Sequence, residues 1–539
     1  MEANPLERQN RSSHMTTTTQ PHPARVGRWA AIVSGIVAAA VAIGVAELLA
    51  ALGRAVNLLS SNASPLLSLG SSFIDLTPAS IVNWAKENLG HFDKPALALG
   101  MGVVLLGLSA AVGLLARRAV LYGSILLAVL GAVVVAAIAS RSLFVIQDIL
   151  PTIFGVVAGN AALRALFRAA PLRSPEDGAT GGDRRRFLQM AGIGAGAAVA
   201  SGGLSQLIPT SAAAEASREH AATEASAAAK FDQLPPLPAG VDLKVDGLSP
   251  FVTPNGDFYR IDTALVVPKL NADTWELRIF GMVDQEVRIN YADLLKRPQI
   301  ERMVTLTCVS NEIGGDLIGN AKWQGTALAD LIREAGPSAD ADMVMSRSSD
   351  GMEIGSPLEV LLDGRDAMLA VAMNGEVLPF EHGFPVRMVV PGLYGYVSAT
   401  KWVVELEVMR YDQAQAYWTQ RGWGAKGPIK TASRIDVPRS FAKLTAGKNA
   451  VAGVAWAQHR GISKVEVQVD DSDWAEAKLS TQLTKDTWRQ WVYEWDATPG
   501  NHNIKVRATD GTGQVQTADV AGVLPDGATG YDSRAVSVS

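Results

Sequence analysis

The segment from His382 to Trp402 reads HGFPVRMVVPGLYGYVSATKW and carries the most information about the fold. It sets three basic side chains, His382, Arg387 and Lys401, around an apolar run that is interrupted by proline and glycine. Taken singly, each of them is explained equally well by a salt bridge or by a buried histidine with satisfied hydrogen bonds. Their joint spacing is harder to explain in this way, and it directs attention to a residue upstream that could hold a metal.

That residue is Cys308, the only cysteine of the chain, which lies in the segment TLTCVSN from Thr305 to Asn311. A single cysteine cannot form an internal disulfide. A buried, inert thiol is one interpretation, because cysteine packs well in protein interiors. A metal ligand or a nucleophile is the other. The local sequence does not choose between them, whereas the segments downstream do.

Taken together, these segments resemble the sulfite oxidase superfamily of molybdopterin enzymes over about residues 247–408. The resemblance rests on TLTCVSN (305–311), IGNAKWQG (318–325), MNGEVLP (373–379) and the segment 382–402. It implies an α+β molybdopterin domain and a molybdenum-cofactor-dependent oxidoreductase. Further on, GVAW (453–456), GISKVEV (461–467) and DGATGY (526–531) resemble the dimerisation domain of the same family. This part implies a homodimer formed through the C-terminal domain.

The resemblance also implies a set of site residues. Cys308 is expected to be the catalytic metal ligand, a soft thiolate that joins the two sulfurs of the pterin dithiolene on molybdenum. Arg387 and Lys401 are expected to bind the terminal phosphate of the pterin, and His382 a pterin or phosphate oxygen. The remaining expected cofactor contacts come from three further segments and are Tyr259, Arg260, Asp350 and Ser398.

The chain departs from sulfite oxidases at the substrate site. Those enzymes follow the cysteine with Ala-Gly-Asn-Arg-Arg, whereas this chain has VSNEI (309–313), and the family's substrate-site tyrosine is Val371 here. A dianion such as sulfite needs cationic donors to offset its desolvation. The sequence therefore favours oxygen-atom transfer with a neutral sulfoxide or N-oxide. Two alternatives stay open, a non-catalytic membrane-tethered binding module and a sulfite dehydrogenase whose anion site is rebuilt from Arg347, Arg410 or Arg421.

Five apolar runs precede this domain, each close to the ~20 residues that cross a hydrocarbon core. They predict a transmembrane helical bundle. Two acids, Glu47 and Asp148, lie near the outer ends of these runs. We interpret them as interfacial side chains, with a quinone-linked proton site as the alternative. The runs are Trp29–Leu52, Ala96–Leu115, Ala119–Ala139, Leu143–Leu163 and Met190–Ile208.

The distribution of arginine and lysine predicts the orientation of these spans in the cell membrane. With a cytoplasmic N-terminus, twelve basic residues lie inside and four outside, which places the catalytic domain on the extracytoplasmic side. The segment DRRRFLQ (183–189) precedes a Gly/Ala-rich run and resembles a twin-arginine export signal. Ordinary cytoplasmic charge before a final span is the alternative.

The sequence limits the redox groups of the chain. None of the seven histidines lies within the five apolar runs, and there is no Cys-x-x-Cys-His motif. Haem and iron–sulfur clusters are therefore not expected, since both need ligands that the chain lacks. A flavin is not expected either. The resemblance implies a molybdenum–molybdopterin cofactor, a small-molecule substrate and a separate electron carrier, either a quinone or a soluble redox protein.

The predicted organisation is multi-domain. Residues 209–539 hold 32 basic and 43 acidic residues, which argues against a nucleic-acid partner. Alternating strands after residue 437 predict an immunoglobulin-like β-sandwich. Short helices are expected at Thr77–Leu89, Tyr291–Leu295 and Ala327–Ala335. The expected parts are a disordered N-terminus (1–28), transmembrane helices (29–208), a linker (209–238), the catalytic domain (239–436) and the sandwich (437–539).

Overall fold

The computed structural model describes residues 25–56, 58–78, 81, 93–141, 144–170, 172–173, 181–207, 212–227 and 231–539. These residues form two compact units. The first holds residues up to 49 together with 96–135 and 150–205, and the second holds 50–95, 136–149 and 206–539. The predicted disordered N-terminus lies mostly outside the described residues. Its last part is ordered instead, because β1 (Arg25–Val26) pairs with β2 (Leu172–Arg173) and the first long helix begins at Arg28.

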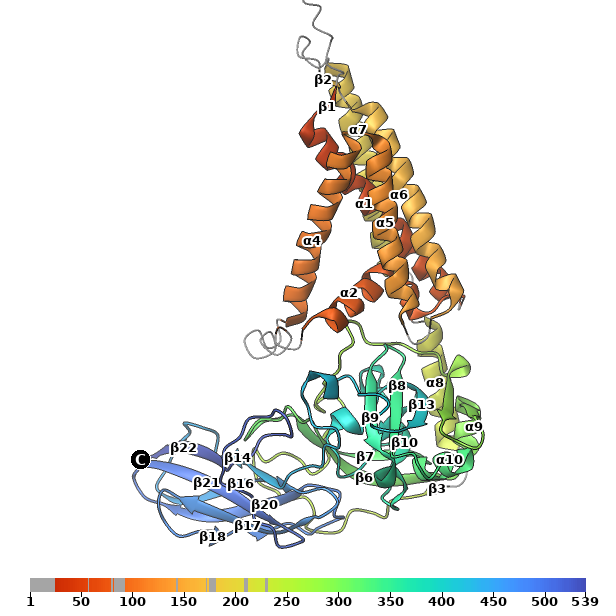
Figure 1. Ribbon diagram of the computed structural model, residues 1–539. Helices are drawn as coiled ribbons and strands as arrows, with labels where there is room; N and C mark the ends of the chain where they lie inside the picture. The colour runs from red at the N-terminus through yellow and green to blue at the C-terminus, as the bar shows by residue number, and fades with distance from the viewer. Residues whose placement is uncertain are drawn as a thin grey trace, which may run out of the picture. The chain divides into compact units, whose positions relative to one another are not determined.

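Five helices in the described residues are long and apolar enough to cross a membrane, as the five apolar runs predicted. Their high hydropathy is spread around the helix surface, which suits a lipid surround rather than a water-facing side. The structure begins the fourth helix later than its apolar run, after the short 3₁₀ turn η3 (Ile146–Ile149). The helices are α1 (Arg28–Ala55), α4 (Asp93–Ala116), α5 (Val120–Ala139), α6 (Leu150–Ala169) and α7 (Gly181–Leu207) (Figure 1).

Small residues allow these helices to pack closely. A Cβ atom added at Gly113 of α4 would lie 1.9 Å from the carbonyl oxygen of Ala31 in α1. A Cβ atom at Gly155 of α6 would lie 2.3 Å from the carbonyl oxygen of Ala42. Both distances are too short for any side chain, so the helix backbones touch at these glycines. Close backbone approach at small residues is how helices associate where lipid removes the hydrophobic driving force.

The part of the second unit that we expected to be the catalytic domain is built on two sheets. The first has the order β11-β10-β7-β6-β3, with β12 also paired to β10, and the second has the order β5-β4-β13-β8-β9. Strand β10 is buried along its whole length, because it has neighbours on both sides and its side chains pack into the core on both faces. The bounds are β3 (Phe231–Asp232), β4 (Glu276–Gly281), β5 (Val287–Asn290), β6 (Gln299–Thr307), β7 (Ile318–Ala327), β8 (Met343–Ser348), β9 (Glu353–Pro357), β10 (Met368–Met373), β11 (Glu376–Val377), β12 (Arg387–Val389) and β13 (Val403–Met409).

Short helices connect these strands. The two that the sequence predicted are present as α9 (Tyr291–Lys296) and α10 (Leu328–Ala335). Helix α10 ends where Gly336 adopts a left-handed backbone conformation (φ +67°), which favours glycine at a helix C-terminus. The others are α11 (Leu358–Leu362) and the 3₁₀ turns η4 (Ala272–Thr274), η5 (Phe380–His382), η6 (Gly395–Val397) and η7 (Thr419–Arg421).

The C-terminal domain consists of two mainly antiparallel sheets, as the alternating pattern predicted. One has the order β14-β16-β20-β19 and the other β15-β22-β21-β17-β18. Side chains from both sheets, among them Val451, Trp491 and Ile504, form one shared core, so the domain is a β-sandwich. The strands are β14 (Ala432–Val437), β15 (Lys443–Leu444), β16 (Gly447–Trp456), β17 (Ile462–Val469), β18 (Ala475–Glu476), β19 (Lys478–Leu479), β20 (Arg489–Ala497), β21 (Gly500–Asp510) and β22 (Asp532–Val538).

Two helices of the second unit were not predicted. Helix α8 (Ala212–Ala227) occupies most of the segment that we expected to be a tether. Its Arg218 donates to the carbonyl oxygens of Leu378 and Val377 at 2.9 and 3.1 Å, so this segment is packed on the catalytic domain. Helix α2 (Pro65–Leu76) lies in the loop between α1 and α4. The helix that we predicted at Thr77–Leu89 lies mostly outside the described residues.

The acid Asp148 has a structural role in the second unit. Its carboxylate accepts hydrogen bonds from the backbone N–H and the hydroxyl of Ser60, at 2.9 and 2.7 Å, and from the backbone N–H of Val145 at 3.2 Å. The side chain is fully buried and joins two loops that are distant in sequence. These contacts explain an acid at this position without a redox role.

Candidate functional site

Cys308 stands directly after β6, where the chain leaves the sheet. Its backbone N–H donates to the carbonyl oxygen of Leu317 at 2.9 Å, and its carbonyl oxygen accepts from the N–H of Asn311 at 3.1 Å. The side chain of Asn311 in turn accepts from the N–H of Leu317 at 2.8 Å. This closed turn holds the thiol, which is 7% exposed, at the wall of a cavity.

The cavity has a volume of about 120 Å³ and opens to solvent. It brings six of the eight predicted site residues together from segments far apart in the sequence. Arg260 and Ser398 are not among the residues that line it. The six that line it are Tyr259, Cys308, Asp350, His382, Arg387 and Lys401.

Arg387 is the main positive charge of the cavity wall. Its side chain is buried, donates to the carbonyl oxygens of His382 and Met388, and lies 4.8 Å from the Trp323 ring. Among the described residues it forms no ion pair with a carboxylate. Burial lowers the pKa of the Arg387 guanidinium to about 10, which still leaves it charged at neutral pH. A buried charge without a counter-ion is costly, so the site is suited to an anionic group.

His382 ends the 3₁₀ turn η5 and is buried beside the edge of the Phe258 ring. Its Nε2 lies 3.0 Å from the carbonyl oxygen of Asn255. Burial, followed by the nearby charge of Arg387, lowers the pKa of His382 to about 4. The ring is therefore neutral at physiological pH. With Nε2–H donating to Asn255, its Nδ1 is left as an acceptor.

Lys401 and Arg260 share one carboxylate at the cavity. The Lys401 Nζ and the Arg260 Nε each lie 2.8 Å from the Asp262 carboxylate. Burial lowers the pKa of Lys401 to about 8, although Asp262 opposes this shift. Burial alone would raise the pKa of Asp262, but the charges and hydrogen bonds of Lys401 and Arg260 together outweigh it and lower that pKa to about 2. Sequence reasoning missed Asp262, which neutralises part of this positive group.

Three other predicted residues have distinct surroundings. The Tyr259 ring stacks on the Phe258 ring, with centroids 5.2 Å apart. Burial together with the charge of Cys308 raises the pKa of the Tyr259 phenol. Burial likewise raises the pKa of Asp350. The Ser398 hydroxyl donates to the carbonyl oxygens of Leu393 and Tyr394, at 3.1 and 2.9 Å. Its hydrogen is therefore used to shape the loop. Of the two contacts with a cofactor that we expected, through the backbone or the hydroxyl of Ser398, this bonding disfavours the hydroxyl, and the backbone contact stays a prediction.

An aromatic group lines the same cavity and was not predicted. The Trp423 ring contacts those of Tyr396 and Trp418, with centroids 5.9 and 6.4 Å apart, and all three residues line the cavity. We call these three residues the aromatic wall. Trp418 and Trp423 follow the end of the recognisable motifs, so only the fold reveals them. Trp323, by contrast, is fully buried, which suits a packing role.

The three arginines that could have rebuilt an anion site are engaged elsewhere. Arg347 pairs with Glu353, Glu405 and Glu407. Arg410 pairs with Asp412, and the Arg421 guanidinium lies 3.5 Å from the centre of the Tyr417 ring. None of the three lines the cavity.

The donor set fits a molybdenum–pterin cofactor. The cavity offers one soft sulfur, one buried guanidinium without a carboxylate partner and one ammonium, which match a thiophilic metal on an anionic organic carrier. The part of the chain that the structure describes contains no cluster of three or more histidine, cysteine or acidic side chains that could hold a bare metal ion. Cys308 would supply the protein ligand, while Arg387 and Lys401 would hold the phosphate.

Comparison with known proteins gives an independent result for the same region. Residues 264–418 match the oxidoreductase molybdopterin binding domain. An uncharacterized oxidoreductase of Bacillus subtilis, YuiH, is 31% identical over 153 residues, which are 28% of this chain and 74% of that protein. Human mitochondrial sulfite oxidase is 28% identical over 320 residues, and Arabidopsis thaliana sulfite oxidase is 25% identical over 365 residues.

The extent of these matches differs between relatives. The alignment with the human enzyme covers 50% of this chain and 58% of the enzyme, and the alignment with the plant enzyme covers 56% and 90%. Among solved structures, the sulfane dehydrogenase SoxCD of Paracoccus pantotrophus superposes with a TM-score of 0.46 at 23% identity, covering 54% of this chain and 81% of that one.

The fold and the cavity thus define a molybdopterin-binding oxidoreductase. More narrowly, the chain belongs to the sulfite oxidase family of these enzymes. The family resemblance seen in the sequence is confirmed, and so is the enzyme class. The substrate, the electron acceptor and the side of the membrane on which the domain lies are not determined by this membership.

Proposed function

We propose that this protein is a membrane-anchored molybdopterin oxidoreductase that transfers an oxygen atom to or from a neutral substrate, a sulfoxide or an N-oxide, outside the cytoplasm. The observation that carries the proposal is the cavity itself, in which Cys308, Arg387 and Lys401 meet beside the aromatic wall. The cofactor, when bound, supplies two-electron chemistry coupled to the transfer of one oxygen atom.

The charge distribution supports a neutral substrate. The two basic side chains in the cavity are those expected to hold the pterin phosphate, and two acids, Asp262 and Asp350, line the same cavity. A dianion would need further cations to offset its desolvation, and Arg347, Arg410 and Arg421 are paired elsewhere. The aromatic wall would instead bury an apolar substituent of the substrate.

The residues of the chain have separate tasks in this proposal. Cys308 would hold the metal from the protein side. Arg387 and Lys401 would position the pterin through its phosphate, and the neutral His382 ring would accept a hydrogen bond from it through Nδ1. Tyr396, Trp418 and Trp423 would exclude water from the substrate end.

The first prediction concerns substrate choice. We expect purified enzyme to reduce aryl sulfoxides or N-oxides with a reduced viologen dye at a kcat/KM at least about a hundredfold above that for sulfite oxidation, because sulfite finds no spare cations. A panel of sulfoxides, N-oxides and sulfite, assayed with redox dyes, measures this ratio. We expect Trp423→Ala to raise KM for the aryl substrates while molybdenum content stays unchanged. A preference for sulfite would favour the sulfite dehydrogenase alternative.

The second prediction concerns export. The excess of arginine in the predicted inside segments, together with Asp183–Gln189, supports an extracytoplasmic catalytic domain and a twin-arginine route. We expect Arg184→Lys with Arg185→Lys to leave the catalytic domain inside the cell. Protease protection in spheroplasts measures its location, and Arg117→Lys with Arg118→Lys is the matched control. Normal export of the Arg184/Arg185 variant would reject the twin-arginine route.

The C-terminal sandwich supports a homodimer in this proposal, by its likeness to the family's dimerisation domain. The mass of the detergent-solubilised protein, measured by light scattering, tests this point. A monomer at working concentration would contradict it.

A further inference from the structure

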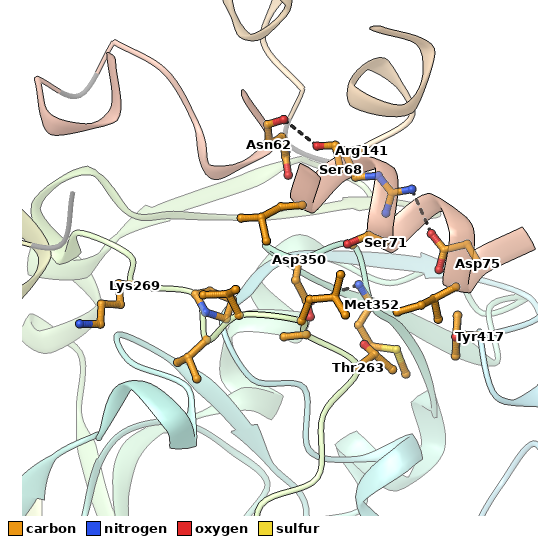
Figure 2. Close-up of a pocket in the computed structure, with 18 of the residues that line it drawn as sticks. Asn62, Ser68, Ser71, Asp75, Arg141, Thr263, Lys269, Asp350, Met352 and Tyr417 are labelled. Atoms are coloured by element: carbon orange, nitrogen blue, oxygen red, sulfur yellow. Dashed lines mark hydrogen bonds and ion pairs between the residues drawn. The ribbon is translucent and has the colours of Figure 1, made fainter. Parts of the chain in front are cut away.

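A second cavity lies within the same compact unit and adjoins the cofactor cavity. It has a volume of about 310 Å³ and is formed by α2, by the loop from Thr263 to Lys269 and by residues 350–352 (Figure 2). We call it the α2 cleft. Thr263, Asp350 and Met352 line both cavities, so a single layer of side chains separates them.

We propose that the α2 cleft binds the head group of a membrane quinone, which exchanges electrons directly with the cofactor. This inference rests on the proposed function, because it names the electron partner of that site. The balanced reaction is substrate oxide plus quinol giving substrate, quinone and water. Two electrons and two protons leave the quinol, and the oxygen atom removed from the substrate leaves as water.

The walls of the α2 cleft suit an amphiphilic ring. Leu67 and Ile74 of α2 and Val267 of the loop are apolar lining residues, which would bury the faces of a quinone. Polar donors also line the cleft, and Figure 2 labels Asn62, Ser71 and Arg141 among them. A quinone carries two carbonyl oxygens that accept hydrogen bonds, so apolar walls with a few donors are what it requires.

One of these donors is unsatisfied. Asn62 is 7% exposed, and its side-chain nitrogen has no hydrogen-bond partner among the described residues. A buried amide N–H without an acceptor is destabilising, so such a group normally has a partner. Arg141, beside it, donates to the Ser72 hydroxyl at 2.7 Å and pairs with Asp75 at 3.0 Å. A carbonyl oxygen in the cleft would satisfy the Asn62 amide.

The position of α2 in the chain favours a ligand from the membrane. The helix begins ten residues after α1, a candidate membrane span, and Arg54 in the last turn of α1 also lines the cleft. On another face of α2, Leu66, Phe73 and Leu76 are exposed at spacings of seven and three residues, which places them on one side of the helix. An exposed apolar helix face of this kind suits the membrane interface.

The composition of the chain also favours direct transfer. The sequence has one cysteine and no histidine within the apolar runs, so it offers no ligands for a haem or an iron–sulfur relay between membrane and cofactor. A quinone bound against the shared wall needs no relay. Asp350 in that wall is a buried titratable group between the two cavities.

The test compares two substitutions on α2 in the full-length, detergent-solubilised protein. Ser71→Trp places an indole inside the cleft, whereas Leu76→Trp adds the same group at an exposed position that does not line it. We expect Ser71→Trp to lower turnover with decylubiquinol at least about tenfold while turnover with a reduced viologen dye stays within about twofold. Leu76→Trp should leave both rates unchanged. An unchanged decylubiquinol rate in Ser71→Trp would overturn the proposal.

A binding measurement separates this inference from the proposed function. A photoreactive azido analogue of decylubiquinone is applied to protein from molybdenum-starved cells, and the labelled peptides are mapped by mass spectrometry. We expect labelling within residues 58–78 or 263–269, and we expect excess decylubiquinone to prevent it. The Ser71→Trp variant should lose this labelling, whereas the Leu76→Trp variant should retain it. Absence of such labelling overturns the quinone site. If the protein is labelled in this way but transforms no sulfoxide or N-oxide, the quinone site is supported and only the proposed substrate is rejected.

Discussion

The substitution Cys308→Ser should lower turnover by about a thousandfold or more while most of the cofactor stays bound. Serine is nearly isosteric with cysteine, but its hydroxyl is a harder and far less acidic donor than a thiol and does not replace a thiolate on a soft metal. Arg387 and Lys401 are untouched by the change, so their hold on the phosphate remains. Molybdenum and pterin content, with dye-linked turnover, give the two measurements.

The matched control separates a ligand from an inert buried thiol. Ser310 also lines the cavity, two residues away, and Ser310→Ala removes a polar atom there without touching a sulfur. We expect this control to keep turnover within about tenfold of the native protein, a change of ~1.4 kcal/mol at most. The electronic spectrum should lose its sulfur-to-metal charge-transfer absorption in Cys308→Ser only. Unchanged turnover and spectrum in Cys308→Ser would reject the ligand role and favour a packing role for the thiol.

The substitution Arg387→Met should act in opposite directions on cofactor content and on stability. The guanidinium is buried without a carboxylate partner among the described residues, so replacing it with an apolar side chain removes a desolvation cost. We expect the cofactor-free protein to gain about 1–3 kcal/mol in its free energy of unfolding. At the same time the pterin phosphate loses its main cation, so molybdenum content should fall at least about tenfold.

Two further variants sharpen this test. Arg387→Lys keeps the charge but loses bidentate binding, and we expect it to retain an intermediate molybdenum content. Arg410→Met removes an exposed arginine that pairs only with the neighbouring Asp412, and it should change neither quantity. Chemical denaturation of the cofactor-free proteins measures stability. If Arg387→Met destabilises the cofactor-free protein and keeps its molybdenum, the guanidinium belongs to the scaffold and not to the cofactor site.

Much of the fold follows from patterns that are local in the sequence. Five apolar runs of membrane-spanning length became five helices, because hydropathy and length act within one segment. The alternation around Lys464–Val469 and Asn503–Ala508 became β17 and β21, which pair with each other. The helix α8 was missed since its Ala, Glu and Ser residues resemble a tether, and its packing depends on Arg218 reaching two carbonyl oxygens about 160 positions away.

The candidate site was predictable where chemistry-bearing residues stand in compact motifs. Cys308, His382, Arg387 and Lys401 were recognised in this way and do line one cavity. Asp262 was overlooked although it follows Tyr259 and Arg260 closely in the sequence, because only the folded chain brings it to Lys401, 139 positions later. Ser398 was predicted from its place before Lys401, but its hydroxyl turns to two backbone carbonyl groups that the sequence cannot locate.

By itself the sequence determined the five long apolar helices, the enzyme family and the candidate residues for a molybdenum cofactor, because residue type and spacing within a segment carry that information. Only the tertiary structure decided which charged side chains are available to bind a cofactor or a substrate. It paired Arg347, Arg410 and Arg421 with other groups, placed the aromatic wall beside Cys308 and brought α2 next to the cofactor cavity. Desolvation and ion pairing depend on neighbours in space, and those neighbours are set only when distant segments pack together.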